Sequence, residues 1–258
     1  MDGAPGDALG AAFAALEDET VLVGAPGVGE VRDAVTGEVR YRAPGAGGRL
    51  AARGSAWITR THAGVVRVDP DATVEVVTPS RAESLLVWDD TTWIVGMPTG
   101  DVAILILRAD GGSHAIARAP APVGAYPDEA GWALAACDLD QDGQRELLVG
   151  APGAGRVLRV DDLSVTTLST ANVLATGTGR FGAALACDRN TLWVGAPMAG
   201  TEAQGAVHAM RDGTVRLLFE GDATDAQLGF ALHAADDLLV AGAPGASGTP
   251  GRALRILP

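Results

Sequence analysis

Lysine is absent from this 258-residue sequence, and all 19 basic residues are arginine. A glycine-rich phosphate-binding loop of the kind that requires a lysine is therefore excluded. With 32 acidic residues, the formal net charge is −13, and such a chain repels the phosphate backbone of DNA or RNA. We therefore expect no nucleic-acid partner.

Aromatic residues and long apolar runs are also scarce. Aromatic residues make up 4% of the chain although 47% of it is hydrophobic, so the core must be built mainly from alanine, valine and leucine. No apolar stretch approaches the roughly 20 residues of a membrane-spanning helix. The N-terminus shows no basic region followed by an apolar core. We expect no membrane span, and no signal peptide is visible in this chain.

A repeat dominates what is present. The tetrapeptide Val-Gly-Ala-Pro begins at residues 23, 149 and 194, and the variants Val-Gly-Met-Pro and Ala-Gly-Ala-Pro begin at residues 95 and 241. Each follows a short apolar run, and a tight acidic turn usually separates that run from an earlier apolar segment, which indicates paired β-strands. A third strand and usually a fourth follow each tetrapeptide. We expect fourth strands at Glu38–Arg42, His114–Ala117, Ser164–Leu168 and Val215–Phe219.

Six such repeats begin near residues 7, 45, 80, 124, 174 and 222, and the second copy lacks the tetrapeptide. Periods of about 35–50 residues with four strands each indicate propeller blades. We predict an all-β fold, namely a single β-propeller domain over residues 1–258 with six blades of mostly four antiparallel strands. Because the last repeat ends after its third strand, the sixth blade should have three strands or be completed by residues 1–6.

Two cysteines are too few for a disulfide-built scaffold. Cys137 and Cys187 occupy equivalent places, each directly before an aspartate at the end of a first strand. A disulfide needs Cα atoms within roughly 7 Å, and adjacent inner strands of a propeller often lie farther apart. We therefore expect two buried thiols, with a disulfide as the alternative.

The fourth repeat differs from the others in an expanded acidic turn. Its three aspartates alternate, so their carboxylates converge if the backbone curls around an ion, and Gly143 permits that curl. The predicted ligands are Asp138, Asp140, Asp142, Gln144 (through its carbonyl) and Glu146. Oxygen ligands of this kind suit Ca²⁺, and we expect one structural calcium ion. The alternative is a solvated acidic turn that binds nothing. An EF-hand is disfavoured because Val149 stands where its last glutamate would be.

Phe181-Gly182 followed by Gly195-Ala196-Pro197 resembles the FG-GAP repeat, which occurs in the propellers of integrin α-chains and in many bacterial proteins. The resemblance covers nearly the whole chain and is poor over residues 45–79. It implies a calcium hairpin like that of FG-GAP blades, although these carry Asp at the ninth position and this chain has Glu146. Integrin-type propellers usually have seven blades, so six repeats are a departure. The resemblance also implies an extracellular or periplasmic protein.

Two functions from different classes follow. The first is a calcium-binding, non-enzymatic module that contacts a protein or a carbohydrate ligand, as the resemblance to integrin α-chains implies. The second is an enzyme, a lyase or hydrolase that acts on polysaccharide and uses the propeller as a scaffold. A cluster of His, Arg, Tyr and carboxylate side chains at the mouth of the channel would favour the enzyme, whereas the scattered four His and two Tyr residues disfavour it.

Overall fold

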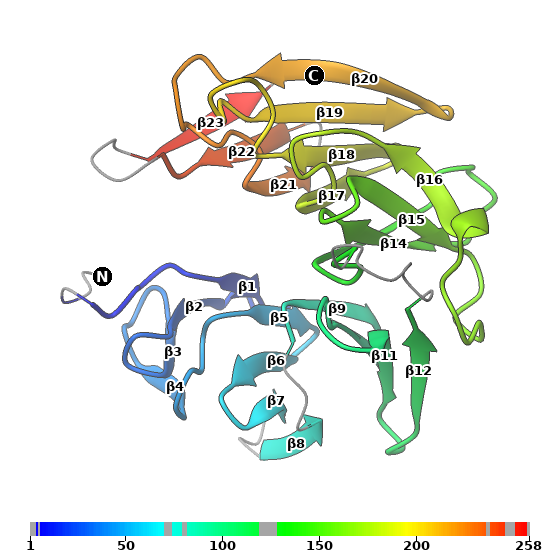
Figure 1. Ribbon diagram of the computed structural model, residues 1–258. Helices are drawn as coiled ribbons and strands as arrows, with labels where there is room; N and C mark the ends of the chain where they lie inside the picture. Colours follow the sequence, from blue (N-terminus) through cyan, green and yellow to red (C-terminus); the bar gives the residue numbers. More distant parts are fainter. Residues whose placement is uncertain are drawn as a thin grey trace. The chain divides into compact units, whose positions relative to one another are not determined.

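The structure, a computed structural model, describes residues 4, 6–69, 74–78, 82–118, 128–235, 238–245 and 251–256. These residues form 23 β-strands and one short 3-10 helix, so the predicted all-β class is confirmed. Figure 1 shows the strands, which are hydrogen-bonded into six separate antiparallel sheets. Within the described residues, no helix is long and apolar enough to cross a membrane.

Each sheet is an antiparallel meander in which consecutive strands pair, the form of a propeller blade. The six predicted repeats correspond to these six sheets, so the protein is a six-bladed β-propeller by its sheet content. The chain divides into two compact units, one formed by Met1–Met97 with Leu105–His114 and the other by Pro98–Ile104 with Ala115–Pro258. The single domain over residues 1–258 stays a prediction.

The first unit holds blades one and two, and blade three contributes strands to both units. Blade one contains β1 (Phe13–Ala15), β2 (Val21–Ala25), β3 (Glu30–Asp33) and β4 (Val39–Arg42). Blade two contains β5 (Leu50–Arg53), β6 (Ala56–Thr61), β7 (Gly64–Val68) and β8 (Val74–Thr78). Blade three contains β9 (Ser84–Asp89), β10 (Thr92–Gly96), β11 (Val102–Arg108) and β12 (Ser113–Ala117).

The second unit holds blades four, five and six. Blade four contains β13 (Ala133–Cys137), β14 (Glu146–Ala151), β15 (Arg156–Val160) and β16 (Val173–Thr176). Blade five contains β17 (Ala184–Asp188), β18 (Thr191–Ala196), β19 (Ala206–Arg211) and β20 (Thr214–Glu220). Blade six contains β21 (Ala231–Ala235), β22 (Leu238–Ala243) and β23 (Arg252–Ile256). Three strands in the sixth blade confirm the expectation, whereas residues 1–3 and 5 lie outside the described residues.

One predicted fourth strand is wrong. Residues 164–168 do not join blade four, whose outer strand is β16 instead. Thr167 forms a parallel bridge with Ala117 at the end of β12, and Leu168 donates its N–H to the Ala117 carbonyl at 2.9 Å. The 3-10 helix (Thr170–Asn172), capped by the Ser169 hydroxyl, then leads the chain into β16. The segment has strand-forming residues, but its backbone groups bond to a different blade.

Apolar side chains are buried between successive blades. The second strands β10 and β14 are buried at every residue, and this explains their continuous apolar sequences. One core cluster joins blades four and five around Phe181, Val194 and Met210. Another joins blades five and six around Trp193, Val207 and Leu239.

The repeated glycines allow neighbouring blades to approach each other closely. A Cβ atom on Gly150, at the end of β14, would overlap the carbonyl oxygen of Gly182, which begins the first segment of blade five. A Cβ on Gly195 would overlap the carbonyl oxygen of Gly229 in the same way. Gly182 and Gly229 have φ values of +94° and +87°, which L side chains rarely adopt. The glycine of one repeat therefore packs against the glycine of the next.

Candidate metal centre

The expanded acidic turn is the hairpin loop between β13 and β14. Cys137 and Glu146 are opposite each other in the register of these strands, so they close the loop formed by residues 138–145. Gly143 has a φ of +88°, which confirms the sharp bend predicted there. Gln141 also has a positive φ, +62°, which the sequence did not indicate because glutamine rarely adopts it. These two bends turn the aspartate side chains toward one another.

Four of the predicted ligands come together. Each of the four offers a carboxylate oxygen, and these oxygens lie within 4.8 Å of one another; the residues are Asp138, Asp140, Asp142 and Glu146. Two oxygens on opposite sides of one Ca²⁺ ion lie about 5 Å apart, since each Ca–O distance is about 2.3–2.6 Å. The spacing therefore fits a single hard cation.

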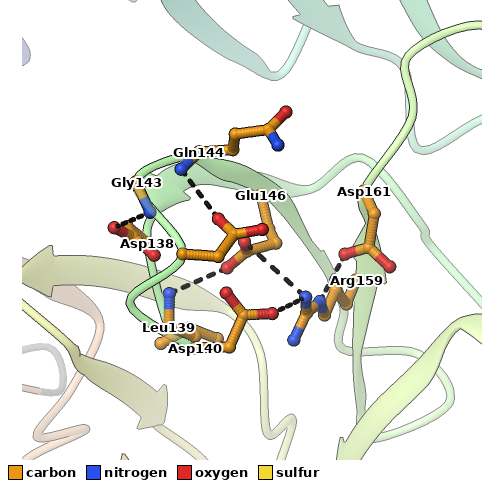
Figure 2. Close-up of polar contacts among 9 residues, drawn as sticks. Asp138, Leu139, Asp140, Gly143, Gln144, Glu146, Arg159 and Asp161 are labelled. Carbon is orange, nitrogen blue, oxygen red and sulfur yellow. Dashed lines mark hydrogen bonds and ion pairs between the residues drawn. The ribbon is translucent and has the colours of Figure 1, made fainter.

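The loop backbone orients these carboxylates (Figure 2). Gly143 donates its N–H to Asp138 Oδ2 at 3.0 Å, and Gln144 donates its N–H to Asp142 Oδ1 at 2.8 Å. The other Asp138 oxygen, Oδ1, is buried and has no hydrogen-bond partner among the residues that the structure describes. A buried carboxylate oxygen without a partner is costly, and a bound cation would remove that cost.

Glu146 is the most buried carboxylate of the cluster, with 3% of its surface exposed. Burial raises the pKa of Glu146. The hydrogen bond that its Oε2 accepts from the Leu139 N–H at 2.8 Å lowers this pKa, but by less than burial raises it. Arg159 also lowers this pKa, whereas the negative charges of Asp140 and Asp138 raise it further. A cation bound between these groups would favour the ionised glutamate.

Arg159, on β15, is the residue that sequence reasoning missed. Its guanidinium bonds to Asp140 and Asp161, and one nitrogen lies 3.6 Å from Glu146 Oε1 (Figure 2). The hydrogen bond from Arg159 is the main reason why the pKa of Asp140 lies below its ordinary value. Although burial alone would lower the pKa of Arg159, its hydrogen bonds to Asp161 and Asp140 raise it. Arg159 thus supplies positive charge beside the four carboxylates.

The two cysteines form a disulfide, which corrects the expectation of two thiols. Cys137 and Cys187 have Cα atoms 5.8 Å apart, inside the range that a disulfide requires. The expectation failed because β13 and β17 are packed side by side at this point, closer than was assumed for adjacent first strands. Since Cys137 directly precedes Asp138, the bond fixes the start of the acidic loop to blade five.

The residues fit a metal ion by their chemistry. All four clustered side chains are carboxylates, the ligands that Ca²⁺ and Mg²⁺ prefer over softer metals. The role of the Gln144 carbonyl stays a prediction.

A second candidate site lies in the first unit. Arg60, His62 and Glu83 line one cavity of about 490 Å³ together with Pro26, Gly45 and Thr61. Arg60 Nη1 lies 2.9 Å from Glu83 Oε1, and His62, in the β6–β7 turn, is exposed. Tyr41 and His62 also line a smaller cavity of about 220 Å³. The larger cavity thus combines His, Arg and a carboxylate, three of the four side-chain types that the enzyme interpretation requires, whereas Tyr41 lines only the smaller one.

Comparison with known proteins identifies one sequence family. The FG-GAP repeat matches residues 130–165, which include β13, the acidic loop, β14 and β15. No curated protein matches the sequence.

Several solved structures share the fold. Virginiamycin B lyase from Staphylococcus aureus is 10% identical with a TM-score of 0.68, over 93% of this chain and 78% of that chain. A streptogramin B lyase is 11% identical with a TM-score of 0.68, over 99% and 85% of the two chains. An extracellular domain assigned to a one component system of B. thetaiotaomicron is 12% identical with a TM-score of 0.64, over 92% of this chain and 32% of that chain. At such identities the similarity concerns the fold alone.

Proposed function

We propose that this chain is a non-enzymatic interaction module of the FG-GAP β-propeller type, which binds one structural Ca²⁺ ion and recognises a protein or glycan. The FG-GAP match over residues 130–165 and the six antiparallel sheets support this proposal. The observation that carries the metal assignment is the convergence of four carboxylates within 4.8 Å, one with a buried oxygen that lacks a partner. The proposed ligands are Asp138, Asp140, Asp142, Glu146 and the Gln144 carbonyl.

The ion would stabilise the protein and take no part in chemistry. Four carboxylates in one loop repel one another, and Arg159 neutralises only part of their charge. Ca²⁺ would replace that repulsion by coordination and fix the β13–β14 hairpin. We also propose an extracellular or periplasmic location, which is supported by the disulfide and by the millimolar calcium that a weak site needs.

Calorimetry tests the metal assignment. We expect one Ca²⁺ ion per chain and no binding to the Asp140→Ala variant, which loses a central ligand. Asp212→Ala, which removes an exposed aspartate from the β19–β20 turn, is the matched control and should bind as the wild type does. With a Kd of about 10–100 μM, millimolar calcium should stabilise the fold by roughly 1.5–3 kcal/mol. An unchanged melting temperature after chelation would contradict the proposal.

One observation favours an enzyme as the second candidate. An imidazole, from His62, lines the same cavity as the Arg60–Glu83 ion pair, and such groups can transfer protons to or from a substrate. The structural neighbours include lyases, one of them described with quinupristin, and that compound is therefore the first probe, followed by acidic polysaccharides. Chromatography should show turnover by the wild type and none by His62→Ala. Absence of turnover by the wild type would contradict the enzyme candidate and favour the interaction module.

A further inference from the structure

Blade six ends on an open strand edge. β23 pairs with β22 on one side, and among the described residues no strand pairs with its other side. In the other five blades, the equivalent third strand carries a fourth strand on that side. An open edge presents unpaired backbone N–H and C=O groups to any chain that can lie beside it.

β23 has the sequence of a covered strand. Residues 253–256 read Ala-Leu-Arg-Ile, residues 157–160 of β15 read Val-Leu-Arg-Val, and residues 65–68 of β7 read Val-Val-Arg-Val. The segments of β15 and β23 are equivalent by register, because Val157 and Ala253 both lie opposite the glycine of the repeat tetrapeptide. The segment of β7 shares their sequence pattern in blade two, which lacks the tetrapeptide. The shared pattern suits a strand with neighbours on both sides.

An apolar side chain of β23 is more exposed than its counterparts in β15 and β7, because blade six has no fourth strand among the described residues. Leu158 and Val66 are 5% and 3% exposed in the covered strands, whereas Leu254 is 36% exposed. A cavity of about 190 Å³ lies beside the edge, lined by Leu254, Arg252, Leu228 and Ala243 among others. The open edge therefore combines unpaired backbone, exposed apolar surface and space for a side chain.

The chain itself shows which strand complements this pattern. In blade two, β8 lies antiparallel to β7 with Glu75 opposite Arg67 and Val76 opposite Val66. Opposite charges at facing positions of an antiparallel pair stabilise it. Arg67 pairs with Asp69, two residues further along, at 2.9 Å, whereas the residue two places after Arg255 is a leucine. Arg255 matches Arg67 in the shared sequence pattern, is exposed, and has no ion-pair partner among the described residues. A strand with an acidic residue at this position would therefore pair with β23.

Other occupants match less well. A second copy of β23 would bring four arginines together and no acid, since Arg252 and Arg255 are its charged residues. Residues 1–6, Met-Asp-Gly-Ala-Pro-Gly, include two glycines and a proline, which disfavour a strand.

We propose that the open edge of β23 binds an extended peptide strand of a partner protein, antiparallel to β23, with apolar residues flanking an acidic residue opposite Arg255. Backbone hydrogen bonds would provide affinity, and the acidic and apolar side chains would provide specificity, as in other cases of strand addition. The site is separate from the metal loop and needs no calcium.

A labelled, capped peptide with the sequence Val-Glu-Val-Val-Thr (that of residues 74–78) serves as the probe, measured by fluorescence anisotropy on the whole chain in chelator. We expect saturable binding that Arg255→Glu weakens by at least about fivefold. The peptide Val-Arg-Val-Val-Thr should bind weakly to the wild type and regain affinity for Arg255→Glu. Arg216→Glu, on the exposed edge strand β20, is the matched control and should leave both affinities unchanged.

Hydrogen exchange should slow in β23 when the peptide binds. Absence of binding would overturn the proposal. Peptide affinities that do not change with Arg255→Glu or with the arginine-containing peptide would also overturn it. Binding that appears only after residues 1–6 are deleted would show that the chain covers its own edge and would also overturn it. Because the measurement is made without calcium, its outcome is independent of the metal proposal.

Discussion

Arg159 lies where a cation would be expected to act, beside Asp140 and Glu146. Its position could not be read from the sequence, because it depends on the register of β15 against β14, which places Arg159 opposite Leu148 and beside the hairpin loop. The four carboxylates, by contrast, were predictable, since alternate aspartates followed by a glycine are a local pattern. At the scale of single residues, long-range contacts of side chains are what the sequence does not indicate.

Arg159→Gln tests whether this arginine competes with the metal. The substitution removes the positive charge beside Asp140 and Glu146 but keeps a side chain of similar length. We expect calcium affinity to rise by about fivefold to tenfold, because Ca²⁺ no longer displaces a guanidinium from its ligands. Calorimetry measures it, with Arg156→Gln on the same strand as the control. A weaker affinity would mean that Arg159 organises the loop for the metal instead.

Glu30 should make stability depend on pH. It is 4% exposed; burial raises its pKa, but hydrogen bonds from Arg32 and Arg42 outweigh burial and lower the pKa below the ordinary 4.5. A carboxyl whose pKa is lower in the folded state stabilises above its unfolded pKa, and this stability is lost as the pH falls through the folded value. Glu30→Gln should therefore cost about 1–3 kcal/mol at pH 7, and the difference from wild type should shrink below pH 4.5.

Urea unfolding at a series of pH values measures this difference. Glu38→Gln, at an exposed position 3.6 Å from Arg40, is the control and should differ little from wild type at any pH. A cost of Glu30→Gln that stays constant from pH 7 to pH 3 would contradict the assigned role of the ion pairs.

At the scale of the element, the blade was largely predictable. The tetrapeptide repeat located the second strand of five blades, and the acidic turns located the first, because both signals are local. The prediction was wrong for residues 164–168, because strand-forming residues do not specify which blade they join. The expectation of two free thiols was wrong for a related reason, because the separation of β13 and β17 depends on how two blades pack.

The repeat glycines give a prediction for blade packing. Gly195→Ala should destabilise the protein by about 3 kcal/mol, because the added methyl overlaps the Gly229 backbone, which cannot move aside cheaply. Gly242→Ala is the matched control: it occupies the same place in blade six, but there the new Cβ meets Ala231 at an ordinary 3.4 Å. Urea unfolding of the two variants compares them. Equal losses in the two variants would show that close approach of the backbones does not explain the glycine.

At the scale of the whole molecule, two compact units divide the chain, and the metal loop and the disulfide both belong to the second. This division was not predictable from the sequence, because all repeats share one pattern. A ligand stabilises the part of a protein that must unfold to release it. Calcium should therefore act unequally on the two units.

Hydrogen exchange with and without calcium measures this inequality. We expect added calcium to slow the exchange of amides in β13–β16 of the second unit and to leave those of β1–β7 in the first unit unchanged. The Asp140→Ala variant should show no calcium effect in either unit. Equal protection throughout the chain would show that the two units unfold together.

The contact between glycines of successive repeats has a consequence for how such genes can grow or shrink. Gly150 lies against Gly182, and Gly195 lies against Gly229, so blade four shares a backbone contact with blade five, and blade five shares one with blade six. A duplication or deletion that cuts the gene at the sheet boundary still inherits both halves of the contact, provided that it removes or copies a whole period. We therefore expect blade number to change by recombination in steps of one full repeat, because a partial repeat would place a side chain against a glycine that leaves no room for it.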